Sequence, residues 1–333
     1  MRADGDDAFV RDTEPFRREM LAHCYRMLGS VDDAEDAVQE TYLRAWRSYG
    51  AFEGRSSVRT WLYRIATNAC LTALERSSRR VLPSGLGGPE PDPQAAPELA
   101  GAGVRWLQPL PDALVAPDSA DPAAVVAARE GLRLALIAAL QYLPGPQRAV
   151  LILRDVLAFP ASEVAGMLGL SVTAVKSSLQ RARGRLRELS LTAEDVTEPA
   201  SPDARAVLDQ YIAAFHDADA VALQRLLRHD AQMESTPIGT WFKGSKTCVP
   251  FLSNWILGAP GDWRMLPTSA NGQPAAVGYR RDADGTGRAY GVVVLAVTGT
   301  SISRIVSFGD PGLALLFGFP ATLPSWGKET PVS

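Results

Sequence analysis

The chain has few cysteines and no long apolar run. Its three cysteines, Cys24, Cys70 and Cys248, are odd in number and far apart among 333 residues. This spacing argues against a disulfide framework and a CxxC-type zinc site, and it predicts buried free thiols. No apolar run approaches the ~20 residues that cross a bilayer, and the acidic start MRADGDDAFVRD lacks the parts of a secretory signal. We therefore expect a cytoplasmic protein without a membrane partner.

The chain also lacks an excess of positive charge, since its formal net charge is -3. This value argues against a wholly basic nucleic-acid binder. The local distribution differs, because nine basic residues stand beside only four acidic ones between Val125 and Ser190. Phosphate affinity depends on such a local patch rather than on the sum over the chain. This part of the chain is therefore a candidate for binding nucleic acid.

The length of the chain and the changes in residue pattern along it predict a modular protein of two or three domains. Apolar residues recur every three or four positions from Glu14 to Arg80 and from Ala123 to about Leu191, which predicts two helical domains. A stretch dense in Pro, Gly and Ala separates them and predicts a linker. The expected boundaries are 10–80 and 123–191 for the helical domains, 81–122 and 192–202 for linkers, 203–320 for a third domain and 321–333 for a tail.

The third domain begins with helix-like segments and continues with short strand-prone runs. The helix-like segments are Ala204–His216 and Val221–Arg228. The strand-prone runs are Ala275–Arg280, Tyr290–Val297 and Ile302–Phe308, separated by clusters of Gly, Asp and Thr. Helices followed by strands indicate an α+β domain.

One part of the first linker, Trp106–Leu114, is too apolar for a fully solvated tether. Two interpretations are open. The segment docks on another part of the protein, or it forms a local turn packed on its own chain. The docking interpretation uses the side chains of Trp106, Leu107, Leu110 and Leu114.

The segment Ala161–Lys176 has the form of a helix, a glycine-containing turn and a second helix. Gly169 supplies the turn, Ser171 caps the second helix, and an apolar stripe begins at Val175. The opposite face carries donors suited to phosphates and to base edges in a major groove. The candidate DNA-binding residues are Thr173, Lys176, Ser177, Gln180, Arg181 and Arg183.

A family resemblance supports this interpretation. The run Leu143–Leu151, with Glu163–Ala165 and Val175–Arg183, resembles region 4 of the extracytoplasmic-function (ECF) sigma factors of bacterial RNA polymerase. In that family this region binds the minus-thirty-five promoter element. Many bacterial response regulators carry a similar helix pair, so the N-terminal domain decides between the two families.

In the N-terminal domain, Ser30–Asp33 predicts a capped helix start. The string Asp33–Trp46 resembles the sigma-factor helix that grips the polymerase clamp. This resemblance implies core RNA polymerase as a partner, whereas a solvated acidic face is the alternative for an isolated helix. The residues implied in polymerase binding are Asp36, Gln39, Glu40, Leu43 and Arg44.

The next segment, Phe52–Asn68, is similar to the family's promoter-melting and minus-ten-reading segment. Melting a duplex requires a trap for an unstacked base, and aromatic surfaces with backbone-binding donors in a loop suit that task. Trp61 lies near both the core stripe and the expected DNA face, so a DNA contact and a structural role are both open. Downstream, Arg76, Arg79 and Arg80 form a basic helix end suited to phosphates. The DNA-binding residues implied here are Gly54, Arg55, Ser56, Ser57, Arg59, Trp61, Arg64 and Asn68.

From Asp203 to Pro320 the order of elements resembles the SnoaL-like polyketide cyclase fold, a cone shared with nuclear transport factor-like proteins. A sigma-factor subgroup carries such a tail, and Trp106–Leu114 looks like a linker sequence of that subgroup. Aromatic residues supply surface for a pocket or an interdomain contact, and most are expected in the core. They are Trp241, Phe242, Phe251, Trp255, Trp263 and Phe308.

The third domain shows no convincing catalytic group, metal site or cofactor site. The visible acid or base candidates are His216, His229, Asp230 and Asp262. The first is expected at a helix end and the next two in a turn, where such residues more often cap or face solvent. We therefore expect no chemistry and instead control of the sigma activity in cis, since a fused domain acts at high effective concentration.

The expected fold is multidomain, with two all-α sigma domains, a region 2 helical bundle and a region 4 helix-turn-helix, plus an α+β SnoaL-like cone-shaped domain. The expected function is a sigma factor that binds core RNA polymerase and promoter DNA, with an anti-sigma factor or a small-molecule ligand as a further candidate partner. The alternatives are a helix-turn-helix activator or ligand-responsive regulator, and a cyclase-like enzyme with a DNA-binding appendage. Residues Asp33–Asn68 favour the sigma factor, and a pocket lined only by apolar groups would exclude the enzyme.

Overall fold

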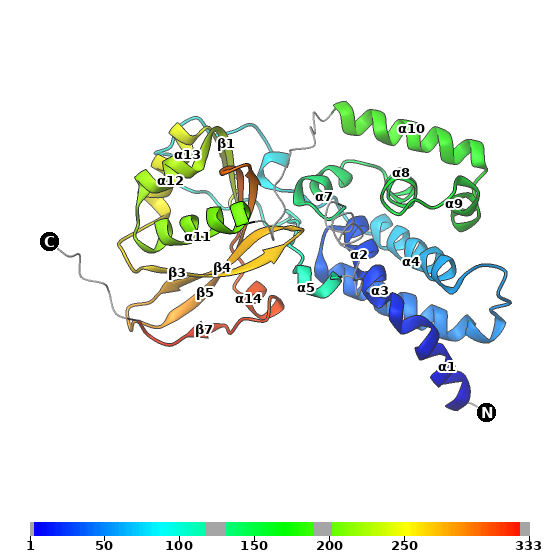
Figure 1. Ribbon diagram of the computed structural model, residues 1–333. Coiled ribbons are helices and arrows are strands. Elements are labelled where there is room, and N and C mark those ends of the chain that lie inside the picture. Colours follow the sequence, from blue (N-terminus) through cyan, green and yellow to red (C-terminus); the bar gives the residue numbers. More distant parts are fainter. Residues whose placement is uncertain (1–2, 117–130, 189–201, 327–333) are drawn as a thin grey trace. The chain divides into compact units, whose positions relative to one another are not determined.

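The computed structural model describes residues 3–116, 131–188 and 202–326, and the chain divides into two compact units (Figure 1). One unit combines Met1–Arg80 with Ala113–Ala193, and the other combines Val81–Asp112 with Glu194–Ser333. The expected helical start at Ala123, nearly all of the linker 192–202 and most of the tail lie outside the described residues.

The first half of the helical unit is a bundle built on three long helices. Its helices are α1 (Ala3–Thr13), the 3-10 turns η1 (Glu14–Phe16) and η2 (Tyr49–Ala51), α2 (Arg17–Leu28), α3 (Val31–Ser48) and α4 (Val58–Glu75). Gly29, at φ 71°, ends α2 in the left-handed conformation, and the Ser30 hydroxyl accepts a hydrogen bond from the N–H of Asp33 to cap α3. Such a cap contributes about 1 kcal/mol. The bundle therefore begins at Ala3, before the predicted helical pattern at Glu14.

The second half of the helical unit contains the predicted helix-turn-helix. Its elements are α5 (Asp112–Val115), α7 (Leu134–Leu140), α8 (Gly145–Leu151), the π-helical turn η4 (Ile152–Val156), α9 (Ala161–Leu168) and α10 (Val172–Glu188). Gly169 turns the chain at φ 65°, and the Ser171 hydroxyl accepts a hydrogen bond from the N–H of Ala174 at 3.1 Å. Both positions confirm the predicted roles in the turn and the cap.

The other unit is a mixed sheet covered by helices. The helices are α11 (Pro202–His216), α12 (Ala220–Leu226), α13 (Ser245–Phe251), the π-helical turn η5 (Leu252–Ile256) and α14 (Gly312–Leu316). The strands are β1 (Leu227–Thr236), β2 (Trp241–Lys243), β3 (Trp263–Ala270), β4 (Gln273–Arg281), β5 (Gly287–Thr298), β6 (Ser301–Phe308) and β7 (Thr322–Leu323). The strand order is β2-β1-β6-β5-β4-β3, and β7 pairs with β5. Only the β1–β6 pair is parallel among the described strand pairs.

One core lies between the sheet and the helices α11, α12 and α13 (Figure 1). Tyr211 and Phe215 of α11 pack with their ring centroids 4.8 Å apart, and Phe215 meets Trp263 of β3 edge to face. Of the aromatic residues expected in the core, Trp255 is 44% exposed and is the exception. Cys24, Cys70 and Cys248 are buried and free, as predicted.

Two sequence expectations in this unit are corrected. Arg228 belongs to β1 rather than to a helix, and His229 and Asp230 also lie in that strand rather than in a turn. The strands β4, β5 and β6 were predictable from apolar runs, whereas β1 (LRHDAQMEST) is rich in polar residues and β3 contains Pro267. Asn271-Gly272 joins β3 to β4, and this dipeptide is the hairpin signal that could have revealed β3.

Candidate functional site

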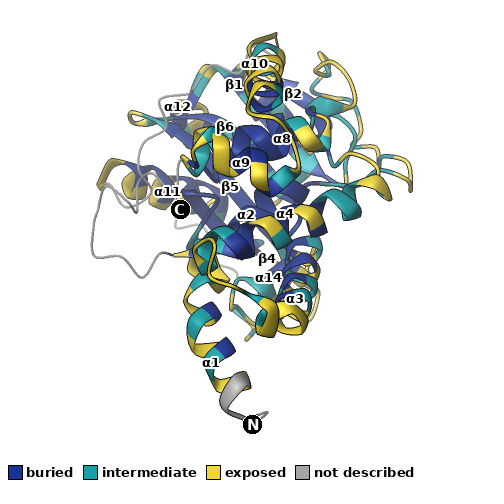
Figure 2. Ribbon diagram, turned by 90° about the vertical axis from the view of Figure 1, so that its right-hand side faces the viewer, coloured by how far each residue is buried: buried dark blue, intermediate teal, exposed yellow. Residues whose placement is uncertain are grey.

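The recognition-type helix α10 has one buried and one polar face. Val175, Leu179 and Ala182 are buried against the rest of the helix-turn-helix. All six candidate DNA-binding residues are exposed, on turns of α10 that are yellow in Figure 2: Thr173, Lys176, Ser177, Gln180, Arg181 and Arg183. Exposed donors along one helix face are what entry into a major groove requires.

Arg183 differs from its neighbours because its guanidinium group already has a partner. Its Nε and Nη2 atoms donate to the two carboxylate oxygens of Asp155 at 2.8 and 2.7 Å. This hydrogen bonding raises the pKa of Arg183, so the side chain remains a cation. An exposed pair of this kind contributes little stability. The pair with Asp155 is therefore weak enough for a competing anion to displace it.

The loop before α4 places polar groups in solvent. Gly54 adopts φ 69°, and Arg55 and Ser56 are exposed beside it. The Ser57 hydroxyl accepts a hydrogen bond from the N–H of Thr60 at 3.0 Å and caps α4. One further polar face follows on α4, where the exposed residues Arg64 and Asn68 lie one turn apart.

Trp61 and Arg59 differ from the exposed members of this group. Trp61 is only 5% exposed and its ring centroid lies 4.9 Å from that of Phe52, which favours the structural role over a DNA contact. Arg59 donates from Nε to a carboxylate oxygen of Glu19 at 2.7 Å and stacks on Tyr63. In this arrangement Trp61 is buried and Arg59 is engaged by Glu19 and Tyr63.

The basic cluster at the end of α4 is also engaged. The helix ends at Glu75, with Arg76 as its C-cap, so Arg79 and Arg80 lie beyond it. Arg80 pairs with Asp33 at 2.7 Å, and the Arg79 guanidinium lies 4.1 Å from the ring centroid of Tyr142. These cations therefore hold the fold together in the described structure.

The proposed polymerase-binding residues lie together on α3. Asp36, Gln39 and Leu43 are exposed, while Glu40 and Arg44 are partly buried and pair at 2.6 Å. Asp36, Glu40 and Arg44 also line an open groove between α3 and α4. An exposed leucine amid acidic residues suits a protein partner better than it suits DNA.

The two halves of the helical unit contact each other through the segment that precedes and begins α9. Phe159 meets Tyr63 edge to face, with centroids 5.1 Å apart, and the Arg59 guanidinium lies 5.0 Å from the Phe159 centroid. The Thr60 hydroxyl donates to a carboxylate oxygen of Glu163 at 3.2 Å. The contact thus covers part of the α4 surface expected to meet DNA.

Buried arginines join the same two halves. Arg26 of α2 donates to the carbonyl of Gly131 at 2.9 Å, and Arg148 of α8 donates to the carbonyl of Met27. Burial lowers the pKa of each arginine to about 10, so both remain cations near neutral pH.

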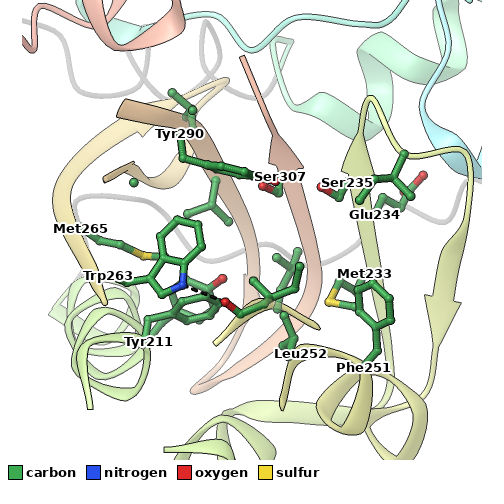
Figure 3. A pocket seen from close by; sticks show the side chains of 18 of the residues that line it. Tyr211, Met233, Glu234, Ser235, Phe251, Leu252, Trp263, Met265, Tyr290 and Ser307 are labelled. Carbon is green, nitrogen blue, oxygen red and sulfur yellow. Dashed lines mark hydrogen bonds between the residues drawn. The ribbon is translucent and has the colours of Figure 1, made fainter. Parts of the chain in front are cut away.

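The α+β unit holds an apolar, partly open cavity between the sheet and the helices (Figure 3). Its wall is mainly aromatic and aliphatic, with Tyr211, Phe242, Trp263 and Met265 among its members. Its polar members are few, and Figure 3 shows Ser235 and Ser307 on the same side of the cavity as Tyr290. Such a cavity suits a small molecule.

The acid and base candidates predicted from the sequence lie elsewhere. His216 pairs with Asp217 at a helix end, His229 has a side chain 92% exposed, and Asp262 accepts a hydrogen bond from the N–H of Ala259. None of these residues, nor Asp230, is among the described residues that line the cavity. The carboxylate at the cavity is Glu234 of β1, which the sequence interpretation missed because an isolated glutamate in a polar strand carries no signal.

The linker residues 81–112 dock on the α+β unit. The Ser84 N–H donates to Glu234 Oε2 at 2.7 Å, and the Glu90 N–H donates to the carbonyl of Trp241 at 2.7 Å. Farther along, the Leu110 N–H donates to the side-chain oxygen of Asn271 at 2.9 Å. Within Trp106–Leu114, the hydrogen bond of Leu110 favours the docking interpretation, whereas Trp106 and Leu107 pair with Val81 of the linker itself.

The apolar linker residues take different parts in this docking. Leu107 and Leu110 are fully buried, Trp106 is half-buried and forms a bridge to Val81, and Leu114 is half-buried in α5 of the helical unit.

Within the described residues, no group of three or more His, Cys, Asp or Glu residues is placed to hold a metal ion. A search of the same residues finds no helix with the length and apolarity that a membrane span needs.

Comparisons with known proteins cover most of the chain. Residues 13–80 match the family model of sigma-70 region 2, and residues 133–186 match that of sigma-70 region 4. The ECF RNA polymerase sigma factor SigG of Mycobacterium tuberculosis is 48% identical over 318 residues, which cover 95% of this chain and 85% of that protein. The ECF RNA polymerase sigma factor SigW of Bacillus subtilis is 29% identical over 184 residues, or 55% of this chain and 88% of that protein.

A solved structure is similar over both units. The crystal structure of the Mycobacterium tuberculosis extracytoplasmic function sigma factor SigJ matches with a TM-score of 0.59 at 24% identity, covering 94% of this chain and 99% of that one. This likeness shows a shared fold. The predicted fold class, two helical sigma domains followed by an α+β domain, is confirmed.

Proposed function

The chain belongs to the ECF family of RNA polymerase sigma factors, and on that premise we propose that it directs core RNA polymerase to promoters from the cytoplasm. It binds core polymerase, recognises the minus-thirty-five and minus-ten promoter elements and starts transcription. The observation that carries this function is the presence of both region 2 and region 4 on one chain. A response-regulator-type activator needs only the helix pair of region 4.

Each region has its own task in this proposal. The exposed face of α10 reads the upstream element, with Gln180 on a base edge and Lys176 on phosphates. The loop Gly54–Ser57 and Asn68 capture an unpaired base of the downstream element. The α3 face around Asp36 docks on the polymerase.

The packed helical unit represents a closed form of the factor. Regions 2 and 4 bind two separate promoter elements, so they must part before both can act. The contact between Phe159 and Arg59 opposes that separation and also occupies a residue of the DNA-reading segment. Partners that bind the open form therefore have to supply the free energy that breaks this contact.

The α+β domain controls this activity in cis and performs no chemistry. Its hydrogen bonds to Ser84, Glu90 and Leu110 give it a direct hold on the linker that joins regions 2 and 4. The position of the acid and base candidates outside the cavity also supports a role without catalysis. An anti-sigma factor is a further candidate partner.

Reconstituted transcription with purified core polymerase tests both parts of the proposal. The full-length chain should produce transcripts from its promoter, and truncation after Thr197 should change their amount several-fold. Replacing Trp106 by Ala should reproduce part of that change, because it weakens the docked linker. Equal transcription and equal core affinity of the full and truncated chains would refute the regulatory role of the α+β domain. Absence of any transcript would refute the sigma function.

A further inference from the structure

We infer that the cavity of the α+β unit binds a neutral, largely apolar small molecule that carries a hydroxyl or carbonyl group. We further infer that its occupancy acts on the linker through the segment 234–241. The second statement rests on the proposed regulation in cis, whereas the first concerns binding alone.

The apolar character of the ligand follows from the cavity wall. Phe215, Phe251 and Trp263 contribute aromatic surface, and Met233 and Met265 contribute flexible thioethers that adapt to ligand shape. The side chains in Figure 3 close around the space from both the sheet and the helices. An apolar molecule that enters this space gains contacts and loses its hydration.

The neutral character of the ligand follows from the state of Glu234. The carboxylate of Glu234 is fully buried, accepts from the Ser84 N–H at one oxygen and pairs with Arg304 at the other. It is the only Asp, Glu, Lys, Arg or His among the described residues that line the cavity. A charged ligand would therefore find no free counter-charge and would lose its hydration without compensation.

The polar group of the ligand is indicated by one cavity hydroxyl without a partner. Thr240 lines the cavity, and its Oγ1 atom is buried without any hydrogen bond. Ser235, Ser307 and Tyr290 also bring hydroxyls to the wall. A buried hydroxyl without a hydrogen-bond partner is unfavourable. A ligand oxygen that forms a hydrogen bond with the Thr240 hydroxyl removes this cost and is itself satisfied.

The coupling to the linker follows from the two sides of the segment 234–241. Ser235, Ile238 and Thr240 line the cavity. Alternating with them, Pro237 accepts at its carbonyl from the Ala100 N–H at 3.0 Å, and the Gly239 N–H donates to the carbonyl of Glu98 at 2.9 Å. A ligand that favours one position of this segment therefore shifts the equilibrium of linker docking.

The first experiment measures binding to the purified full chain. N-phenyl-1-naphthylamine, a neutral fluorophore, should bind saturably with one site per chain. Naphthalene and 2-naphthol should displace it, and the charged naphthalene-2-sulfonate should fail to do so. Equal competition by the sulfonate would overturn the neutral class of ligand, and fluorescence that never saturates would overturn the site.

Two variants locate the site. Replacing Thr240 by Val should weaken 2-naphthol about threefold to tenfold and leave naphthalene unchanged, because one hydrogen bond is lost. Thr298→Val is the matched control, since Thr298 also has a buried hydroxyl without a partner but does not line the cavity. Ser307→Leu should weaken every probe at least tenfold by filling the space, with an unchanged melting temperature as the check on folding. Unaltered affinities in both cavity variants would place the probe elsewhere.

The second experiment follows amide hydrogen exchange in the linker with and without 2-naphthol. The amides of Glu90 and Ala100 should change their exchange rates at least twofold, while those of α10 should not. Unchanged exchange under saturating probe would overturn the coupling. The binding experiment does not depend on transcription, and the truncation test of the proposed function does not depend on a ligand. Either proposal can therefore be refuted without affecting the other.

Discussion

Arg148 of α8 donates a hydrogen bond to the carbonyl of Met27 near the end of α2, and the two residues are 121 positions apart in the chain. The same guanidinium group donates to the Gln141 side chain at 2.8 Å and to the Leu143 carbonyl at 3.1 Å. A cation beside the C-terminal carbonyls of a helix is favourable. The acceptors described for Arg148 are all neutral, so regions 2 and 4 are joined without a buried ion pair at this point.

The closed form should loosen when Phe159 is replaced by Ala. The substitution removes the ring that contacts Tyr63 and Arg59, which together contribute about 1–3 kcal/mol. We expect a larger radius of gyration by small-angle scattering and several-fold more transcript at limiting core polymerase. Leu315→Ala, at an exposed apolar position, should leave both unchanged. Identical scattering of Phe159→Ala and the unmodified chain would contradict the closed form.

Gln180 and Lys176 should affect promoter binding differently. Replacing Gln180 by Ala should cost about 1–3 kcal/mol at one base position, because a base-edge contact is specific. Replacing Lys176 by Ala should weaken all sequences similarly and lower the salt dependence, because a phosphate contact is not specific. Footprints on a set of single-base promoter variants measure both effects, and unchanged footprints for both variants would refute the assignment.

Reversing the charges of Asp36 and Glu40 with lysines should abolish co-purification with core polymerase. Both residues lie on the α3 face proposed to dock on the clamp, and reversing their charges removes the charge complementarity expected of that interface. Circular dichroism should show unchanged helicity. The same reversal at the exposed residues Asp203 and Asp284 serves as the control and should leave binding intact. Survival of the complex after the first change would place the docking surface elsewhere.

The Arg55 and Asn68 double alanine variant should lose transcription from duplex promoters. On templates melted in advance it should recover only in part, because opening is bypassed while base reading is still missing. Both residues are exposed, so the change should not affect folding. Transcript yields are measured on duplex and pre-melted templates of the same sequence. Full activity of the variant on duplex DNA would count against the capture loop.

Acid should destabilise the helical unit through His23. Its Nε2 lies 2.9 Å from the Thr67 hydroxyl, which itself donates to the Tyr63 carbonyl, so Nε2 carries the proton. Nδ1 is buried without a partner, and burial lowers the pKa of His23 from 6.5 to about 3. The unfolded chain therefore binds more protons below pH 6.5, and stability present above that value is lost as the pH falls toward 3.

This effect amounts to roughly 2 kcal/mol between pH 6.5 and pH 5. Urea unfolding of the full chain at several pH values should show a flatter pH dependence for His23→Gln. The control His229→Gln changes an exposed side chain and should keep the original slope. Equal slopes for both variants would show that another group causes the acid sensitivity.

Much of this architecture could be predicted from the sequence because local signals and packing agree. Gly169, Ser171 and the stripe at Val175 together fit the turn, the cap and the buried face of a helix-turn-helix. The apolar runs of β4, β5 and β6 likewise identify strands that are buried on both faces.

The contacts that arise from folding could not be predicted in this way. Glu234 and Ser84 are 150 positions apart, and neither has a neighbour in sequence that indicates the other. Arg59 and Arg80 are basic residues of the kind that bind DNA, yet each forms an ion pair within the folded chain. Trp61 was open between two roles because periodicity places it at the border of a helix face, and only packing against Phe52 resolves its burial.

The docked linker also sets the reach of region 4. The segment Val81–Asp112 belongs to the α+β unit, so only residues 113–133 lie between that segment and the start of α7. These 21 residues span at most roughly 75 Å when fully extended, whereas the 53 residues from 81 to 133 could span more than twice that length. Undocking therefore lengthens the free chain between regions 2 and 4. A longer free chain increases the range of promoter spacings that the two DNA-reading regions can bridge.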